Sequence, residues 1–111
     1  MQWHGQRAVV TLPEEIDISN SAMIQDELIS VLGKRPAALI VDMTPTTYCD
    51  SAGVRAVMLA YRQAASSGCE LRLVISAAPV MRVFSLLGAD RLIRIDAGLA
   101  DALGHSSDPG K

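Results

Sequence analysis

Residue types that many enzymes and metal proteins depend on are scarce in this sequence. Its two cysteines, Cys49 and Cys69, lack CxxC spacing and lie beside apolar segments, so we expect buried free thiols rather than a disulfide or metal pair. Its two histidines, His4 and His105, lie near the ends of the chain, which leaves a serine or cysteine nucleophile without its usual base. We therefore predict no enzymatic activity, no metal site and no cofactor.

Glycine-rich phosphate-binding loops are also missing. The sequence contains neither Gly-x-x-x-x-Gly-Lys-Ser/Thr nor Gly-x-Gly-x-x-Gly, which argues against nucleotide hydrolysis and dinucleotide binding. Receiver domains of two-component signalling are similar in size, and Asp42 or Asp50 resembles their phosphoacceptor. Receivers also have a lysine late in the sheet, whereas the only lysines here are Lys34 and Lys111. The receiver class is therefore not supported.

No basic stripe and no long apolar run are present. The net charge is −2 and the ten Lys and Arg residues are scattered, which argues against a nucleic-acid-binding surface. No segment approaches the roughly 18 apolar residues that cross a bilayer, and the first residues do not resemble a signal peptide. We expect a cytoplasmic protein that binds another protein, with no nucleic-acid or membrane partner.

Strand-like and helix-like apolar patterns alternate along the chain. Strands are predicted at residues 7–12, 39–41, 71–75 and 92–95. Helices are predicted from possible caps at residues 17–21 to residue 32, from an N-terminus at residues 50–53 to the stop at Gly68, and at residues 79–87 and 98–103. This order predicts one α/β domain with a mixed or parallel sheet of four to five strands flanked by about four helices. Residues 1–6 leave room only for a short or incomplete extra strand. We place the domain at residues 1–103 and a flexible tail at 104–111.

The spacing of apolar residues assigns a buried face to each of the three longer helices. The predicted buried positions are Ile24, Leu28, Val31 and Leu32 in the first helix, Val54, Val57, Met58 and Tyr61 in the second, and Val80, Val83, Phe84 and Leu87 in the third. Arg55 and Arg62 of the second helix, and Met81 and Arg82 of the third, are predicted to face outward.

The segment from Leu39 to Ala65 organises the rest of the chain. Its apolar start, residues 39–41, suits a central strand covered on both faces. The helix that follows the turn carries its apolar residues from Val54 onward, so residues 50–53 lie at its N-terminus. A strand-to-helix turn at the carboxyl end of a parallel strand is where α/β sheets place their sites.

The sequence supports two interpretations of Ser51. The first amides of a helix lack intrahelical partners and the macrodipole is positive there, so Ser51 is a plausible phosphate carrier. In the other interpretation, Asp50 or Ser51 merely caps the helix, a role that both residue types fill routinely.

Several segments resemble the STAS domains of anti-sigma factor antagonists. Val41-Asp42-Met43 followed by Tyr-Cys-Asp-Ser-Ala-Gly-Val at residues 48–54 resembles the family's signature of a strand, a polar turn and a helix opening on Asp-Ser. Residues 13–17 resemble its turn before the first helix, and residues 79–88 resemble its helix that ends in glycine. The resemblance covers about residues 7–103.

The resemblance implies roles for five residues at this turn and in the loop before the first helix. Ser51 corresponds to the serine that a partner kinase phosphorylates, and Asp17, Asp50, Ala52 and Gly53 would bind the partner. Arg55 is added to the partner-binding residues because it is an exposed position of the helix next to this turn. Asp17 is equally well explained as a solvated loop carboxylate or a helix cap. A glycine in the first helical turn costs up to about 1 kcal/mol relative to alanine, so Gly53 predicts the close approach of another backbone, from a partner or a neighbouring loop.

The chain departs from the family pattern at three positions. Glu14 and Arg55 stand where glycine is common, and Asn20 stands where threonine or serine is common. A bulky cation at position 55 would either clash with a family-type partner or select an acidic one.

Two functional hypotheses follow. In the first, the unmodified protein binds an anti-sigma factor with an ATPase-like serine kinase fold and so releases a sigma factor. Phosphorylation of Ser51 then ends the binding, and a serine phosphatase restores it. In the second, the protein is a constitutive interaction module that docks a partner without phosphorylation, and Ser51 only belongs to a helix cap.

Overall fold

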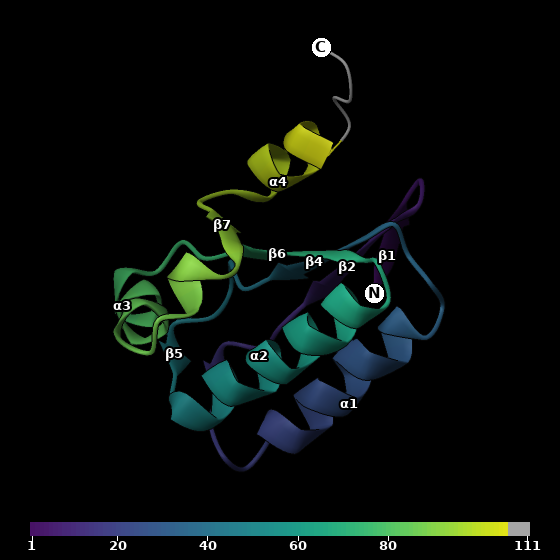
Figure 1. The fold of residues 1–111 in the computed structure, drawn as a ribbon. Coiled ribbons are helices and arrows are strands. Elements are labelled where there is room, and N and C mark those ends of the chain that lie inside the picture. Colours follow the sequence, from purple (N-terminus) through teal and green to yellow (C-terminus); the bar gives the residue numbers. More distant parts are fainter. Residues whose placement is uncertain (107–111) are drawn as a thin grey trace.

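A five-stranded sheet forms the centre of the computed structural model, which describes residues 1–106 (Figure 1). The spatial order of the strands is β1 (Gln2–His4), β2 (Arg7–Thr11), β4 (Ala38–Asp42), β6 (Glu70–Val74) and β7 (Arg94–Asp96). β1 runs antiparallel to β2, and all other neighbours are parallel. The predicted mixed sheet is confirmed, and so is the short N-terminal hairpin, because β1 has only three residues.

Helices cover both faces of this sheet. The four α-helices are α1 (Ser21–Leu32), α2 (Ser51–Ser66), α3 (Ala78–Leu86) and α4 (Leu99–Ser106), and a 3₁₀ turn, η1 (Ala89–Arg91), follows α3. In Figure 1, α1 and α2 lie side by side under the sheet and α4 lies above it. α4 extends past the predicted domain end at residue 103, and residues 107–111 of the predicted tail lie outside the described part.

The alternation of side chains along the strands supplies a core on each face. Ala8, Val10, Leu39 and Val41 belong to the large core beneath α1, α2 and α3, whereas Val9, Ile40 and Val74 meet Ala102 of α4. All five residues of β4 are buried, as the unbroken apolar run predicted for a central strand. The four predicted buried residues of α1 are all buried.

The predicted buried face of α3 is wrong at its end. Val80 and Phe84 are buried, but Leu87 is 54% exposed and Met81, predicted to face outward, packs against the core. The reason is that α3 ends at Leu86, and Gly88 turns the chain with a φ of 80° before the helical period reaches Leu87. β7 also begins two residues later than predicted, because η1 takes up residues 89–91 and Leu92 is exposed.

The structure also contains a second, two-stranded sheet that was not predicted from the sequence. β3 (Glu15–Ile16) pairs in parallel with β5 (Tyr48–Cys49), with Ile16 opposite Cys49. Two-residue strands are too short to produce a period in the sequence. This small sheet fastens the loop before α1 to the turn before α2, and so decides which residues surround Ser51.

Candidate functional site

Asp50 is the N-cap of α2. Its backbone is extended, and its Oδ1 accepts hydrogen bonds from the amides of Ala52 at 3.0 Å and Gly53 at 3.1 Å. Of the two capping candidates, Asp50 therefore has this role. Ser51 is the first residue of the helix and is exposed, and its hydroxyl makes no hydrogen bond within the described part of the chain.

The capping carboxylate changes what an anion would meet at Ser51. Helix-start chemistry predicts unpaired amides there, but Asp50 already accepts hydrogen bonds from two of the first three amides of α2. A phosphate on the Ser51 hydroxyl would still lie at the positive end of the helix dipole, yet it would have a carboxylate as its neighbour.

The small β3–β5 sheet brings Asp17 close to Asp50. The amide of Asp50 donates to the carbonyl of Ile16 at 3.2 Å, and Asp17 and Asp50 each follow one member of the Ile16–Cys49 pair. Hydrogen bonds from the hydroxyl and then the amide of Ser19 lower the pKa of the Asp17 carboxyl. The structure thus brings the loop of Asp17 next to the turn that carries Asp50 and Ser51.

Asn20 fixes the shape of the Asp17 loop. Its side-chain oxygen accepts from the amide of Asp17 at 3.0 Å, and its side-chain nitrogen donates to the carbonyl of Glu15 at 2.8 Å. An amide side chain carries its donor and its acceptor on different atoms, so Asn20 can bind the amide of Asp17 and the carbonyl of Glu15 at the same time. The departure from threonine or serine at this position therefore has a structural explanation.

Gly53 is buried where two side chains leave no room for a Cβ. A Cβ built there would lie 2.6 Å from Sγ of Cys49 and 2.6 Å from Cγ2 of Ile16. The expected approach of another backbone is wrong, because the close neighbours are side chains of the small sheet. Glycine at this position lets the first turn of α2 lie against that sheet, and Ala52 beside it is half-buried.

Cys49 and Cys69 are buried free thiols, as predicted. Burial, and secondarily the charge of Asp50, raises the pKa of the Cys49 thiol to about 11. Burial also raises the pKa of Cys69. Both thiols are therefore protonated at neutral pH, and Cys49 serves as a packing residue behind the Ser51 turn.

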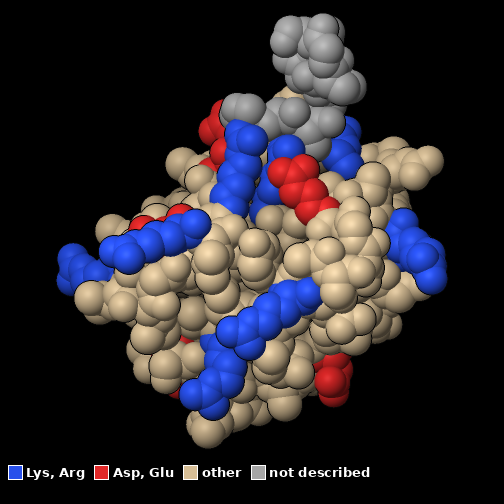
Figure 2. All heavy atoms as spheres, in the orientation of Figure 1, with Lys and Arg blue, Asp and Glu red and all other residues tan. Residues whose placement is uncertain are grey.

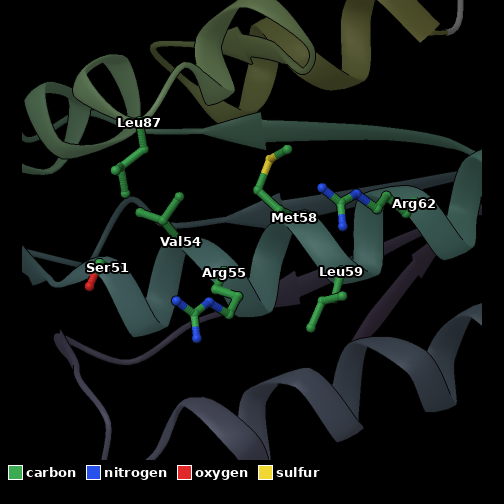
Figure 3. A pocket seen from close by; sticks show the side chains of 7 residues that line it. All are labelled: Ser51, Val54, Arg55, Met58, Leu59, Arg62 and Leu87. Atoms are coloured by element: carbon green, nitrogen blue, oxygen red, sulfur yellow. The ribbon is translucent and has the colours of Figure 1, made fainter.

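A groove of about 390 Å³ runs along α2 from the Ser51 turn to the end of α3 (Figure 3). Its lining residues are Ser51, Val54, Arg55, Met58, Leu59, Arg62 and Leu87. Leu59 and Leu87 are 36% and 54% exposed, so part of the lining is apolar surface open to solvent. Leu87 was predicted to be buried. The glycine at position 88 could have indicated its exposure, because a glycine there ends the helix before Leu87.

The face that carries the groove is basic. α2 contains Arg55 and Arg62 and no acidic residue, and α3 contains Arg82 and no acidic residue, although the protein as a whole has a net charge of −2. Figure 2 shows Lys and Arg side chains crossing this face over the position of α2. The arrangement offers a partner an apolar centre with a cationic rim.

The described residues also bear on metals and membranes. They contain no group of three or more His, Cys, Asp or Glu side chains arranged to hold a metal ion. None of the helices in this part is both long enough and apolar enough to cross a bilayer.

Comparison with known sequences gives a family match and a curated relative. The model of the STAS domain family matches residues 1–102. The anti-sigma-F factor antagonist RsfB of Mycobacterium tuberculosis is 25% identical over 100 residues, covering 90% of this chain and 81% of the relative. This relative is named as an antagonist of an anti-sigma factor and not as an enzyme.

Comparison with solved structures supports the fold. An anti-sigma factor antagonist from Mycobacterium paratuberculosis superimposes with a TM-score of 0.82 at 23% identity, covering 96% of this chain and 91% of that one. A Thermotoga maritima protein gives a TM-score of 0.87 at 19% identity, with coverages of 96% and 92%. The murine anion transporter Slc26a9 gives 0.79 at 21% identity, covering 96% of this chain but only 18% of the transporter.

Proposed function

Because the chain belongs to the STAS domain family, we propose that it is an anti-sigma factor antagonist whose unmodified form binds an anti-sigma factor and releases a sigma factor. One observation carries this proposal. An exposed serine lies on the first turn of α2, beside a carboxylate, and opens onto a groove with an apolar centre and a basic rim. The name of the M. tuberculosis relative points to the same class of partner.

The docking surface in this proposal is the Ser51 turn together with the groove. It comprises Asp17, Asp50, Ser51, Ala52, Arg55, Leu59, Arg62 and Leu87. Gly53 is buried and acts indirectly, by letting α2 lie against the small sheet. An apolar centre with charged surroundings is typical of the energetically important part of a protein interface. The matching partner surface is apolar and acidic, since the cations of the groove select opposite charge.

Phosphorylation of Ser51 is the proposed off-switch. The partner, an anti-sigma factor with an ATPase-like serine kinase fold, transfers the γ-phosphoryl group of ATP. The Ser51 Oγ–P bond forms as the bond to ADP breaks, and the hydroxyl proton passes to a base of the kinase.

The phosphate adds a charge of about −1.5 to −2 next to Asp50 and Asp17. A partner surface fitted to a neutral hydroxyl would then have to desolvate a dianion, which costs several kcal/mol. A serine phosphatase reverses the change in the cytoplasm.

Titration calorimetry against the cognate anti-sigma factor tests the switch. We expect the Ser51-phosphorylated protein to bind at least about 100-fold more weakly than the unmodified protein, a loss of roughly 2.7 kcal/mol. Ser51→Ala should bind normally and resist modification. Ser51→Asp should weaken binding only partly, because one carboxylate carries less charge than a phosphate. Equal affinity of the phosphorylated and unmodified proteins would refute the switch.

The alternative is a constitutive interaction module, and one observation favours it. Asp50 alone caps α2, so the turn needs no phosphate for its shape, and Ser51 can be a bystander. In that case the docking surface still binds its partner, but the protein's intact mass stays unchanged after co-expression with the kinase. An 80 Da increase at Ser51 would support the switch instead.

A further inference from the structure

We propose that Arg55 holds the phosphate of phosphorylated Ser51, so that the modified protein supplies its own counter-ion. This inference rests on the proposed phosphorylation and concerns the regulation of that same site. It assigns to Arg55 a second contact, made only after modification.

The spacing of the two residues on α2 places them within reach. Ser51 and Arg55 are at positions i and i+4 and both line the groove. Side chains at this spacing have Cβ atoms about 5–6 Å apart, and an anion placed N-terminal to its cation is the favourable order. In Figure 3 the side chain of Arg55 leans toward the end of α2 where Ser51 lies. Arginine side chains in helices point in this direction because Cα–Cβ bonds tilt toward the N-terminus.

Arg55 can bind a phosphate without first breaking another interaction of its side chain. Its side chain is exposed and makes no hydrogen bond or ion pair within the described residues, and α2 carries no carboxylate to compete for it. Arg72, by contrast, is held by Glu70 through a 2.9 Å contact. The cost of breaking an existing pair is therefore absent at position 55.

The backbone amides at the start of α2 offer a phosphate on Ser51 few free hydrogen-bond donors. The amides of Ala52 and Gly53 already donate to Asp50 at 3.0 and 3.1 Å, so two of the usual anion-binding groups at a helix start are occupied. A guanidinium presents a planar fork of donors that matches two phosphate oxygens. Arg55 is thus the strongest donor available to a phosphate on Ser51.

The other charges near the phosphate define the balance. Asp50 before the helix and Asp17 on the neighbouring loop oppose its second ionisation, whereas Arg55 favours it. Arg62 also lines the groove, but it lies eleven residues from Ser51, about 16 Å along the helix. The end of α3 contributes Leu87, which has no charge.

One consequence concerns the docking surface. In the unmodified protein the Arg55 cation faces the partner, and in the phosphorylated protein it is turned onto the phosphate. Modification then adds negative charge and withdraws positive charge from the same surface.

The test uses full-length protein with phosphoserine incorporated during translation at position 51, so neither a kinase nor a partner is needed. A ³¹P NMR titration gives the second pKa of the phosphate in the otherwise unchanged protein and in its Arg55→Gln and Arg62→Gln variants. We expect Arg55→Gln to raise this pKa by about 0.3 pH unit or more, from the strength of an i,i+4 pair. Arg62→Gln should leave it unchanged, and 1 M NaCl should shrink the Arg55 effect.

A second readout follows the arginine itself. The Nε–H resonance of Arg55 should shift when Ser51 carries the phosphate, and the Nε–H resonance of Arg62 should not. Equal pKa values in the unchanged protein and Arg55→Gln, or equal shifts from both variants, would overturn the proposal. Because partner binding is not measured, these outcomes are independent of whether phosphorylation acts as the off-switch.

Discussion

Gly53 shows how the absence of one atom shapes the site. The Ile16 and Cys49 side chains occupy the positions next to its Cα, so the small sheet and the first turn of α2 fit together only with glycine. A residue that the sequence suggested for a partner contact thus has a structural role inside the chain.

Gly53→Ala should destabilise the protein. The added methyl group would clash with two side chains, and such overpacking typically costs about 1–3 kcal/mol, which exceeds the helix propensity gain of up to about 1 kcal/mol. Urea denaturation measures the difference. Gly104→Ala in α4 is the matched control, because nothing lies within 4 Å of a Cβ built there. The double variant Cys49→Ala/Gly53→Ala should regain part of the loss, and a higher Tm for Gly53→Ala would contradict the packing explanation.

Cys49 should make stability depend on pH in the alkaline range. Its pKa in the folded protein is about 11, above the value of about 8.5 in an unfolded chain. Between these values the folded state keeps a proton that the unfolded state loses, so the free energy of unfolding falls as the pH rises from about 9 to 11.

Cys49→Ala removes this titration. The stability difference between wild type and variant should be constant from pH 6 to 7.5 and should shrink by about 2–3 kcal/mol by pH 10.5, measured by urea denaturation. A difference that does not change with pH would show that the thiol ionises alike in both states.

At the scale of elements, the end of α3 and the exposed face of α2 form the groove. Leu87 and Leu92 are both exposed leucines, at 54% and 58%, but only Leu87 lines the groove, because Leu92 lies farther along the chain, after η1. This pair separates docking from general surface hydrophobicity.

Leu87→Asp should weaken binding of the anti-sigma factor at least about tenfold, because it puts a charge at the apolar centre of the docking surface. Leu92→Asp should leave the affinity unchanged. Both variants should keep their stability within about 0.5 kcal/mol, since both side chains are exposed. Calorimetric titration and thermal melts measure the two effects, and equal loss of affinity in both variants would remove the groove from the docking surface.

The elements that the sequence predicted well are those whose burial follows a regular period. The buried run of β4 and the apolar face of α1 were predicted, because β4 is buried on both faces of the sheet and α1 packs against the large core at a helical period. β3 and β5 were not, because two-residue strands depend on tertiary contacts, and the exposure of Leu87 was missed although Gly88 marked the end of α3. For the site, the position of Asp50 and Ser51 at the start of α2 was predicted from the apolar period of the helix. The neighbours of Gly53 could not be predicted, because they depend on the pairing of Ile16 with Cys49.

For the whole molecule, the large core lies behind the Ser51 turn, where Ile16 and Cys49 belong to it, and the α4 core lies on the other face of the sheet. Ser51 is exposed, and the elements that hold it, α2 and the small sheet, are packed from behind. A charge added at Ser51 is therefore placed in solvent and not in the core.

Phosphorylation of Ser51 should accordingly leave the fold intact. The net charge changes from −2 to about −4, but the new charge lies at the positive end of α2, where the dipole is worth roughly 0.3–1 kcal/mol. We expect amide NMR shifts confined to residues around 15–20 and 48–58 and a Tm changed by only a few degrees. Widespread shifts in β6 or α4 would indicate a global rearrangement instead.

Two arginines hold α4 on the sheet face opposite α2. Arg72 on β6 donates to the carbonyl of Ala102 at 2.7 Å, and Arg7 on β2 donates to the carbonyl of Leu103. The last described helix, α4, therefore lies on the side of the sheet away from α2, the helix that begins with Ser51 (Figure 1). A bead, a fluorophore or a fused protein attached after α4 would orient the domain with its serine outward, so that the molecule can be tethered without masking the surface it presents.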